Sequence, residues 1–456
     1  MSATAVSPDL AEVESRLLAR WPETRIAPSL ERISRLLDLL GGPQQNYRSV
    51  HLTGTNGKTS TARMVEALLA ASGHRTGRLT SPHLTSIRER IAVAGQPISE
   101  DAFVAAWRDA DAQASRVDAV MEHPLSFFEM TVAMGYLAFS RAEVDVAVVE
   151  VGMGGRWDAT NVIDAEVAVI LPIALDHTDY LGPTTVDIAR EKAGVIKPGS
   201  VAVSARQTPE VLEVLQERAD EVGARLLLLD RSFSVTERRP VADGQVITVR
   251  GLHGPCADVH LALRGPHQAD NAACALAATE AMLGRALEPD AARRALGSVT
   301  SPGRLDVHPG RQAVVLDAAH NPHGARALVG ALSEIAPDHR RYAVVAVMAD
   351  KDVDGLLREL APAVDEIVCT ASSSPRSLPA DELADIANGI FASSRVHVAA
   401  DVESALAVAR TLPARPGSAS EAIVLVTGSV VAVADAERLL EAPATPDRPT
   451  VPPLPG

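Results

Sequence analysis

The chain has 456 residues, of which 46% are hydrophobic, so it can bury the cores of two or three domains of about 100–200 residues each. Its formal net charge is -15 and it has no basic block, which argues against a nucleic-acid partner and requires local cations to hold any anionic substrate. The N-terminus lacks the pattern of a signal peptide, no segment has the ~20 apolar residues that span a bilayer, and the three cysteines are far apart, so we expect a cytoplasmic protein without membrane contacts.

The first part of the chain predicts a mostly parallel sheet covered by helices. From residue 48, short apolar runs rich in β-branched residues alternate with longer amphipathic stretches. The predicted strands are 49–53, 144–149, 166–173 and 200–205, and the predicted helices are 61–72, 127–140, 271–283 and 289–299. Between them, residues 232–263 alternate apolar and polar residues around turns, which predicts a small antiparallel sheet. We place the end of this domain at residue 300.

A second α/β series follows the segment SPGR at 301–304. Its predicted strands are 313–319, 342–348, 366–371, 396–400 and 422–428, and each is followed by a helical stretch. This pattern predicts a separate Rossmann-like domain over residues 301–442. The last residues, 443–456, are rich in proline and lack periodicity, so we expect a disordered tail.

The segment GTNGKTS lies directly between a predicted strand and a predicted helix, which is the context of a phosphate-binding loop. Its glycines let backbone N–H groups approach phosphate, its lysine reaches the outer phosphates, and a hydroxyl of Thr59 or Ser60 can bind Mg²⁺. Only two residues separate the glycines where the usual loop has four, and a capped glycine turn is the competing interpretation. We predict an ATP site formed by Gly54, Thr55, Asn56, Gly57, Lys58, Thr59 and Ser60.

The shorter loop resembles that of the Mur ligase superfamily and, within it, the folylpolyglutamate synthase and dihydrofolate synthase family. Further segments resemble that family in the same order: PSLERI (28–33), SPHL (81–84), RERI (88–91), EVGMGGRWDATN (150–161), LDHTDYLG (175–182), REKAGVIKPG (190–199), HQADN (267–271), SPGRLD (301–306), DAAHNPHG (317–324) and DKD (350–352). The resemblance covers nearly the whole chain. It implies a ligase of the bifunctional bacterial type, which uses ATP to join L-glutamate to dihydropteroate or to reduced folates through an acyl phosphate.

The resemblance also implies a second Mg²⁺ site. The first ion would bind a hydroxyl of the phosphate loop, such as that of Ser60. Glu150 and His177 follow predicted strands and so belong to the carboxyl edge of the sheet, where open α/β folds bind ligands. By resemblance, Ser81, Glu150 and His177 hold this second ion, although Mg²⁺ prefers oxygen ligands and the histidine is the weaker inference from chemistry alone. A lysine on a helix is ordinarily a solvated charge. In the family, however, the lysine that matches Lys192 carries a carbamate.

Substrate and nucleotide contacts follow from the same resemblance. The positions that match the dihydropteroate pocket of bifunctional relatives are Ile26, Ala27, Pro28, Ser126, Phe127, Phe128, Glu129, Trp157, Asp158 and Ala159. Ordinary core packing is the competing interpretation for the two phenylalanines. Asn271 is expected at the adenine, while Arg304 and Asp317 are expected at ATP from beyond a hinge. His320 and Lys351 end predicted strands and are further candidates, with a catalytic role for His320.

Three other functions share part of this pattern. A Mur-type cell-wall ligase has the same loop, but it would carry a dedicated N-terminal UDP-binding domain. A P-loop kinase or GTPase would not need Glu150, His177 and Lys192 around a second metal. A non-catalytic nucleotide-binding protein would be expected to have lost some of these groups. We therefore expect a monomeric ligase of small molecules.

Overall fold

The computed structural model describes residues 9–22, 27–310, 312–412 and 422–441. By its internal contacts the chain divides into a first unit, Met1–Leu305 with His323–Pro337, and a second unit, Asp306–Pro322 with Asp338–Gly456. Each unit is described by itself. The predicted tail at 443–456 and the predicted pocket residue Ile26 lie outside the described residues.

Within the described residues, the main sheet of the first unit has eight strands in the order β4-β3-β2-β5-β1-β6-β7-β8. The strands are β1 Arg48–Thr53, β2 Thr76–Leu79, β3 Ile91–Val93, β4 Gln96–Pro97, β5 Val146–Glu150, β6 Val167–Ile170, β7 Val201–Ser204 and β8 Arg225–Leu228. All neighbours pair in parallel except at the β2–β3 and β3–β4 pairs, which are antiparallel. The predicted parallel sheet is confirmed.

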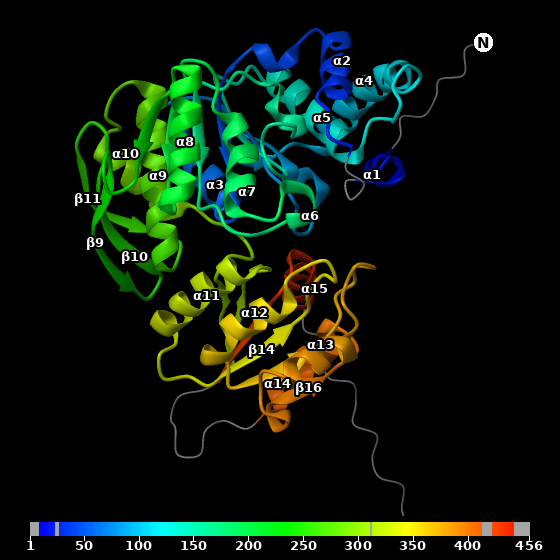
Figure 1. Cartoon of the computed structure of the whole chain (residues 1–456), viewed down its shortest axis with the longest axis vertical. Helices are drawn as coiled ribbons and strands as arrows, with labels where there is room; N and C mark the ends of the chain where they lie inside the picture. Colours follow the sequence, from blue (N-terminus) through cyan, green and yellow to red (C-terminus); the bar gives the residue numbers. More distant parts are fainter. Residues whose placement is uncertain (1–8, 23–26, 311, 413–421, 442–456) are drawn as a thin grey trace, which may run out of the picture. The chain divides into compact units, whose positions relative to one another are not determined.

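Helices cover both faces of this sheet (Figure 1). In this unit they are α1 Leu10–Leu18, α2 Glu31–Leu39, α3 Lys58–Ala71, α4 Glu100–Asp118, α5 Phe127–Arg141, α6 Thr178–Leu181, α7 Thr185–Lys192, α8 Pro209–Val222, α9 Pro266–Leu283, α10 Pro289–Ser298 and α11 Pro322–Ile335, whose first residue belongs to the second unit. Alternation along β5 explains the layers, since Val148 faces the core that includes α3 and α9, whereas Val149 faces the core that includes α4 and α5. The central strands are therefore buried on both faces.

The predicted antiparallel sheet is also confirmed. It consists of β9 Ser234–Val241, β10 Gly244–Arg250 and β11 Pro255–Leu261, paired in the order β11-β10-β9. Its apolar residues, among them Ile247 and Val259, join the same core as α3 and α9. Arg238 on β9 donates to Glu334 of α11 over 2.8 Å, which ties that helix to the first unit.

The second unit is a mixed α/β layer. Its sheet, in the described part of the chain, has six strands in the order β12-β13-β17-β14-β15-β16, and β12 is antiparallel to β13 while the other pairs are parallel. The strands are β12 Asp306–His308, β13 Val314–Leu316, β14 Arg341–Val345, β15 Glu366–Cys369, β16 Val396–Val398 and β17 Ile423–Thr427. The helices are α12 Val353–Leu360, α13 Ala380–Asn388, α14 Val402–Thr411 and α15 Val430–Glu441. The five predicted strands of this series are confirmed.

The three cysteines, Cys256, Cys274 and Cys369, are free and buried. None of the helices in the described residues combines the length and the apolar character needed to cross a membrane.

Candidate active site

The phosphate loop joins β1 to α3 by a path that requires glycine at two points. Gly54 has a φ of 147°, and a Cβ there would lie 2.7 Å from the Cβ of Leu171. Gly57 has a φ of 88°, and its Cβ would lie 2.9 Å from Oδ1 of Asn271. Any side chain at either position would clash or strain the backbone. The loop therefore lies against Asn271, the residue predicted at the adenine.

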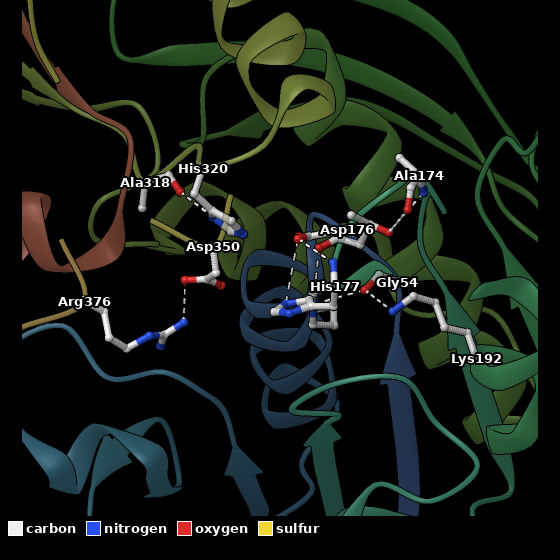
Figure 2. A network of polar contacts seen from close by, with 11 residues as sticks. Gly54, Ala174, Asp176, His177, Lys192, Ala318, His320, Asp350 and Arg376 are labelled. Atoms are coloured by element: carbon white, nitrogen blue, oxygen red, sulfur yellow. Dashed lines mark hydrogen bonds and ion pairs between the residues drawn. The ribbon is translucent and has the colours of Figure 1, made fainter. Parts of the chain in front are cut away.

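Two lysines share one backbone carbonyl of this loop. The Nζ atoms of Lys58 and Lys192 each donate to the carbonyl oxygen of Gly54 over 3.0 Å, and Figure 2 shows the bond from Lys192. Lys192 is only 4% exposed. Burial and then the nearby charge of Lys58 lower the pKa of Lys192 to about 7. The buried ammonium group of Lys192 therefore loses its proton more readily than that of an ordinary surface lysine.

A buried carboxylate lies beside the loop. Glu150 ends β5, is 2% exposed, and accepts hydrogen bonds from the hydroxyl of Thr59 over 3.0 Å and from the backbone N–H of Ser81 over 3.3 Å. Burial raises the pKa of Glu150, although the charge of Lys58 and the two hydrogen bonds oppose that shift. The structure thus brings together an anionic oxygen and two hydroxyl-bearing residues, which is the donor chemistry that Mg²⁺ prefers.

The two hydroxyls offered by the sequence at the loop have different surroundings. Thr59 lies on Glu150, whereas the hydroxyl of Ser60 is 2.9 Å from that of Ser301 and accepts from Gln268 over 3.3 Å. Ser60 therefore connects the loop to the segment that contains Arg304, whose backbone N–H donates to Ser301 over 3.1 Å. Of the two hydroxyls, that of Thr59 is the one placed beside the buried carboxylate.

Arg304 carries its charge toward the same region. Its guanidinium opposes the burial-driven rise in the pKa of Glu150, and after burial it is the largest cause that lowers the pKa of His267 to about 4. Both effects require the cation to lie within electrostatic reach of the two buried groups. The predicted hinge cation therefore lies on the side of the first unit that contains the carboxylate and the phosphate loop.

His177 follows β6 and begins the short helix α6. It has a φ of 53°, and its backbone N–H donates to Oδ1 of Asp176 over 2.9 Å. The Nε2 atom of His177 is 3.9 Å from the same oxygen (Figure 2). Asp176 is not among the predicted site residues, although an acidic residue directly before a candidate ligand histidine is a visible signal in the sequence.

The residues predicted for the dihydropteroate pocket come from three segments, and Arg32 joins two of them. Its guanidinium donates to the carbonyl oxygen of Ala27 over 2.7 Å and to the carboxylate of Glu129 over 3.0 Å. Glu129 also accepts from the backbone N–H of Ser126 over 2.8 Å and thereby caps α5. A cavity of about 430 Å³ lies next to this ion pair, and its lining is Ala27, Pro28, Ser29, Glu31, Arg32, Val120, Met121, Glu122 and His123.

The two phenylalanines at the start of α5 differ in environment. Phe127 is 5% exposed and belongs to the core formed with α4, which supports the packing interpretation for this ring. Phe128 is only partly buried, and its ring lies so close to Gly152 that a Cβ there would be 2.6 Å from Cζ. The loop 152–161, which contains the third predicted segment, therefore contacts α5 at Gly152, where the absence of a side chain leaves room for the Phe128 ring.

That third segment, the loop 152–161, is held by its own acidic residue. Asp158 accepts from the backbone N–H groups of Met153 and Thr160 over 2.9 Å each, and burial raises its pKa. The ring of Trp157 packs partly buried against the core around α7, and its backbone N–H donates to Glu191 over 3.2 Å. Ala159 is buried beside them. The loop is thus anchored to the helix that contains Lys192.

The remaining candidates belong to the second unit and lie at the carboxyl edge of its sheet. Asp317 follows β13 and accepts from the backbone N–H of Ala319 over 2.9 Å. Nδ1 of His320 is 3.0 Å from the carbonyl oxygen of Ala318 (Figure 2). Lys351 follows β14, in a turn closed by a bond from its backbone N–H to Met348 over 3.1 Å.

A parallel α/β sheet with a phosphate loop between its first strand and α3 fits a Mur-type ligase, and comparison with known proteins shows an ATP-dependent ligase of this type. Residues 52–279 match the Mur ligase middle domain, and residues 303–430 match the glutamate ligase domain of Mur ligases. The chain is 47% identical to the dihydrofolate synthase/folylpolyglutamate synthase of Mycobacterium tuberculosis, over 96% of each chain. It therefore belongs to the dihydrofolate synthase/folylpolyglutamate synthase family.

Solved structures with bound ligands resemble it over nearly its whole length. The folylpolyglutamate synthase of Mycobacterium tuberculosis complexed with ADP has a TM-score of 0.92 at 46% identity and covers 95% of this chain and 98% of its own. The Escherichia coli FolC protein in complex with DHPP and ADP has a TM-score of 0.83 at 32% identity, with 96% and 98% covered. The bifunctional enzyme of Yersinia pestis complexed with AMPPNP and Mn has a TM-score of 0.82 at 31% identity, with 96% and 100% covered.

Proposed function

We propose that this chain is bifunctional and uses ATP to add L-glutamate both to dihydropteroate and to reduced folates. The observation that carries the proposal is the buried carboxylate of Glu150, which lies between the hydroxyl of Thr59 on the phosphate loop and Ser81. The ADP, DHPP and metal bound by its relatives support the same substrates and cofactor here. Residues 1–300 would form the ATP-binding domain and residues 301–442 the C-terminal ligase domain.

The proposed reaction has two chemical steps. A carboxylate oxygen of the pteroate or folate first attacks the γ-phosphorus of ATP, the bond to the β-phosphate oxygen breaks, and ADP leaves. The neutral amine of glutamate then attacks the carbonyl carbon of the acyl phosphate, the C–O bond breaks, and phosphate leaves as the amide forms, while the proton lost by the nitrogen passes to the departing phosphate or to solvent. Activation is needed because a free carboxylate is a poor electrophile, and closure of the site protects the acyl phosphate from water.

Side chains of this chain offset the charge that develops in the first step. Lys58 is placed at the loop to neutralise the transferring phosphoryl group, and Arg304 adds a second cation from the segment after α10. Bound Mg²⁺ would neutralise phosphate oxygens, with one ion at the hydroxyl of the phosphate loop and a second held by Ser81, Glu150 and His177. The buried oxygen donors beside the loop fit such an ion.

A carbamate on Lys192 belongs to the same proposal. The neutral amine attacks the carbon of CO₂, a proton leaves the nitrogen, and an anionic carboxylate replaces the ammonium. The lowered pKa of Lys192 supports this chemistry, because only the unprotonated amine has a lone pair to donate. The modified side chain would remove one of the two positive charges at the carbonyl of Gly54.

Purified enzyme tests the proposal directly. Dihydropteroate and tetrahydrofolate are offered separately with ATP, Mg²⁺ and glutamate, and the products are weighed. We expect each of the two substrates to gain a glutamyl group. One ADP should form for each amide bond. ATP hydrolysis without a glutamylated product from either substrate would overturn the ligase proposal, and a product from only one would overturn bifunctionality. Sedimentation and cell fractionation test the accompanying proposal of a cytoplasmic monomer.

A further inference from the structure

The segment RERI, residues 88–91, is one of those that resemble the folylpolyglutamate synthase and dihydrofolate synthase family, but it has no role in the proposed reaction. Residues Ile87–Arg90 form a short 3-10 helix that leads from the loop 81–86 into β3. The loop begins with Ser81, whose backbone N–H donates to Glu150. What holds the loop in place therefore decides where Ser81 lies relative to the buried carboxylate.

Glu89 holds the second half of the loop. Its carboxylate accepts hydrogen bonds from the backbone N–H groups of Leu84 and Thr85 over 2.9 Å each and of Ser86 over 2.7 Å. The hydroxyl of Thr85 adds a fourth bond over 2.7 Å. Burial alone would raise the pKa of Glu89, but these bonds hold it below its usual value. One side chain thus satisfies three consecutive backbone donors.

Arg90 holds the first half. Its Nε donates to Nδ1 of His83 over 2.9 Å, and its guanidinium lies 4.8 Å from the centre of the Phe127 ring. A guanidinium can only donate, so Nδ1 of His83 accepts and the ring proton of the neutral imidazole is on Nε2. The carbonyl oxygen of Arg90 also accepts from the backbone N–H of Thr80 over 3.0 Å, which closes the base of the loop. Arg90 is itself buried.

We infer that Glu89 and Arg90 are positioning residues that fix the loop 81–86, so that Ser81 is presented beside Glu150. The two side chains act from adjacent positions on opposite halves of one loop, and neither is a candidate ligand or a phosphate contact. This inference rests on the proposed function, because Ser81 matters to it as a metal ligand. It assigns to the RERI segment a role in metal affinity that acts through Ser81.

The variant Glu89→Gln tests the inference with little change in volume. An amide has one oxygen and two N–H donors, so it cannot accept all four bonds and would turn a donor toward backbone N–H groups. We expect the Mg²⁺ concentration for half-maximal ligation to rise about 10- to 100-fold, as when outer-shell partners of a metal ligand are lost. Binding of metal-free ATP, measured by calorimetry, should stay at the wild-type level.

A double-variant cycle shows whether Glu89 acts through Ser81. If it does, Ser81→Ala with Glu89→Gln requires no more Mg²⁺ than Ser81→Ala alone, because the positioned hydroxyl is already absent. If the double variant instead raises the Mg²⁺ requirement by the product of the two single effects, the inference is wrong. The matched control is Glu217→Gln, because this exposed glutamate belongs to α8, outside the segment 81–90, and should leave the Mg²⁺ requirement unchanged.

The variant Arg90→Gln keeps the inference testable if Glu89→Gln does not fold. It removes the guanidinium from His83 while leaving the four bonds to Glu89, and it should raise the Mg²⁺ requirement in the same direction. A folded Arg90→Gln or Glu89→Gln enzyme with wild-type metal dependence overturns the inference. Wild-type enzyme that forms no glutamylated product at any metal concentration overturns the proposed function instead, so the two failures are distinguishable.

Discussion

Two ammonium groups on one carbonyl oxygen are an unusual arrangement for side chains that both carry charge. The carbonyl dipole of Gly54 partly compensates one cation, and the second is disfavoured both by burial and by the first. Lys58 is half-buried, whereas Lys192 is 4% exposed. The pair therefore differs in burial, which suits the proposed roles of Lys58 as a cation for phosphate and of Lys192 as an amine with a lowered pKa.

The lowered pKa of Lys192 predicts a specific pH dependence. In CO₂-free buffer, the unfolded chain holds a proton at this lysine up to its ordinary value of 10.5, while the folded chain loses it at about 7. Because the unfolded state binds more protons in that window, the stability due to this group rises with pH from about 7. Thermal melts should show this slope in wild type and a reduced slope in Lys192→Met, and equal slopes would contradict it.

A carbamate on Lys192 leads to a second prediction, which can be tested separately from the pH dependence of stability. Ligase activity should fall in CO₂-depleted buffer and return on addition of bicarbonate, faster at pH 8 than at pH 6. Native mass spectrometry should show an added mass of about 44 Da, that of one CO₂, at this side chain. Lys192→Ala should retain ATP binding but lose ligation, with partial rescue by acetate. Full activity of that variant would contradict the carbamate.

Lys58 is expected to act on the transferring phosphate and not on folding. Lys58→Ala should lower kcat by at least about 10²–10³-fold, because backbone N–H groups cannot replace a lost cation at the developing charge. Its melting temperature should remain near that of wild type, since the side chain is only partly buried. Single-turnover rates with saturating ATP measure the effect, and Arg35→Ala on the exposed face of α2 is a matched cation control.

At the scale of elements, strands with strong apolar character were predictable, and short strands with polar or exposed residues were not. The runs around Val148 and Val169 are buried on both faces and read plainly as strands. By contrast, β4 is two exposed residues, Gln96–Pro97, and β2 contains a glycine and a buried arginine, Arg78, whose ion pair with Glu66 spans 2.6 Å. β2 pairs with β5, which is distant in the sequence, and β4 pairs with β3 across a short turn, so the apolar pattern of each segment alone does not reveal them.

The start of α5 gives a prediction that separates packing from binding. Phe127→Ala should cost about 3–5 kcal/mol of stability, because it empties a buried core position. Phe128→Ala should lower stability much less and should raise KM for dihydropteroate more than KM for ATP, because its ring faces the loop at Gly152. Melting curves and initial rates of both variants decide the matter. Equal stability losses would show that both rings are only core.

At the scale of the whole molecule, the order of motifs predicted more than any motif alone. The two α/β series, the antiparallel sheet and the phosphate loop were all predictable from the sequence. The sequence did not show that Thr59 rather than Ser60 lies on Glu150, or that α11 joins the first unit through Arg238. Those contacts depend on how elements rotate and pack, which has no counterpart in local periodicity.

Removal of divalent metal should separate activity from folding. Two candidate ligands, Ser81 and Glu150, are joined by a hydrogen bond, and the sheet that carries them has apolar cores on both faces, so we expect the fold not to depend on an ion. Chelation by EDTA should therefore abolish ligation while leaving the circular dichroism spectrum and the melting temperature unchanged, and added Mg²⁺ should restore the rate. Unfolding on chelation would contradict this expectation.

The burial of Lys192 has a further consequence for chemical labelling. The chain contains 43 lysines and arginines, but only four are lysines: Lys58, Lys192, Lys197 and Lys351. Arginine stays protonated and does not acylate under mild conditions, so the reactive side-chain amines of the protein are confined to these positions. Lys192 is only 4% exposed, whereas the other three lysines are half-buried, so we expect bulky acylating reagents to modify Lys192 last. A small linear electrophile such as CO₂ should be hindered less by this burial, so the fold should make the labelling of Lys192 depend on the size of the reagent.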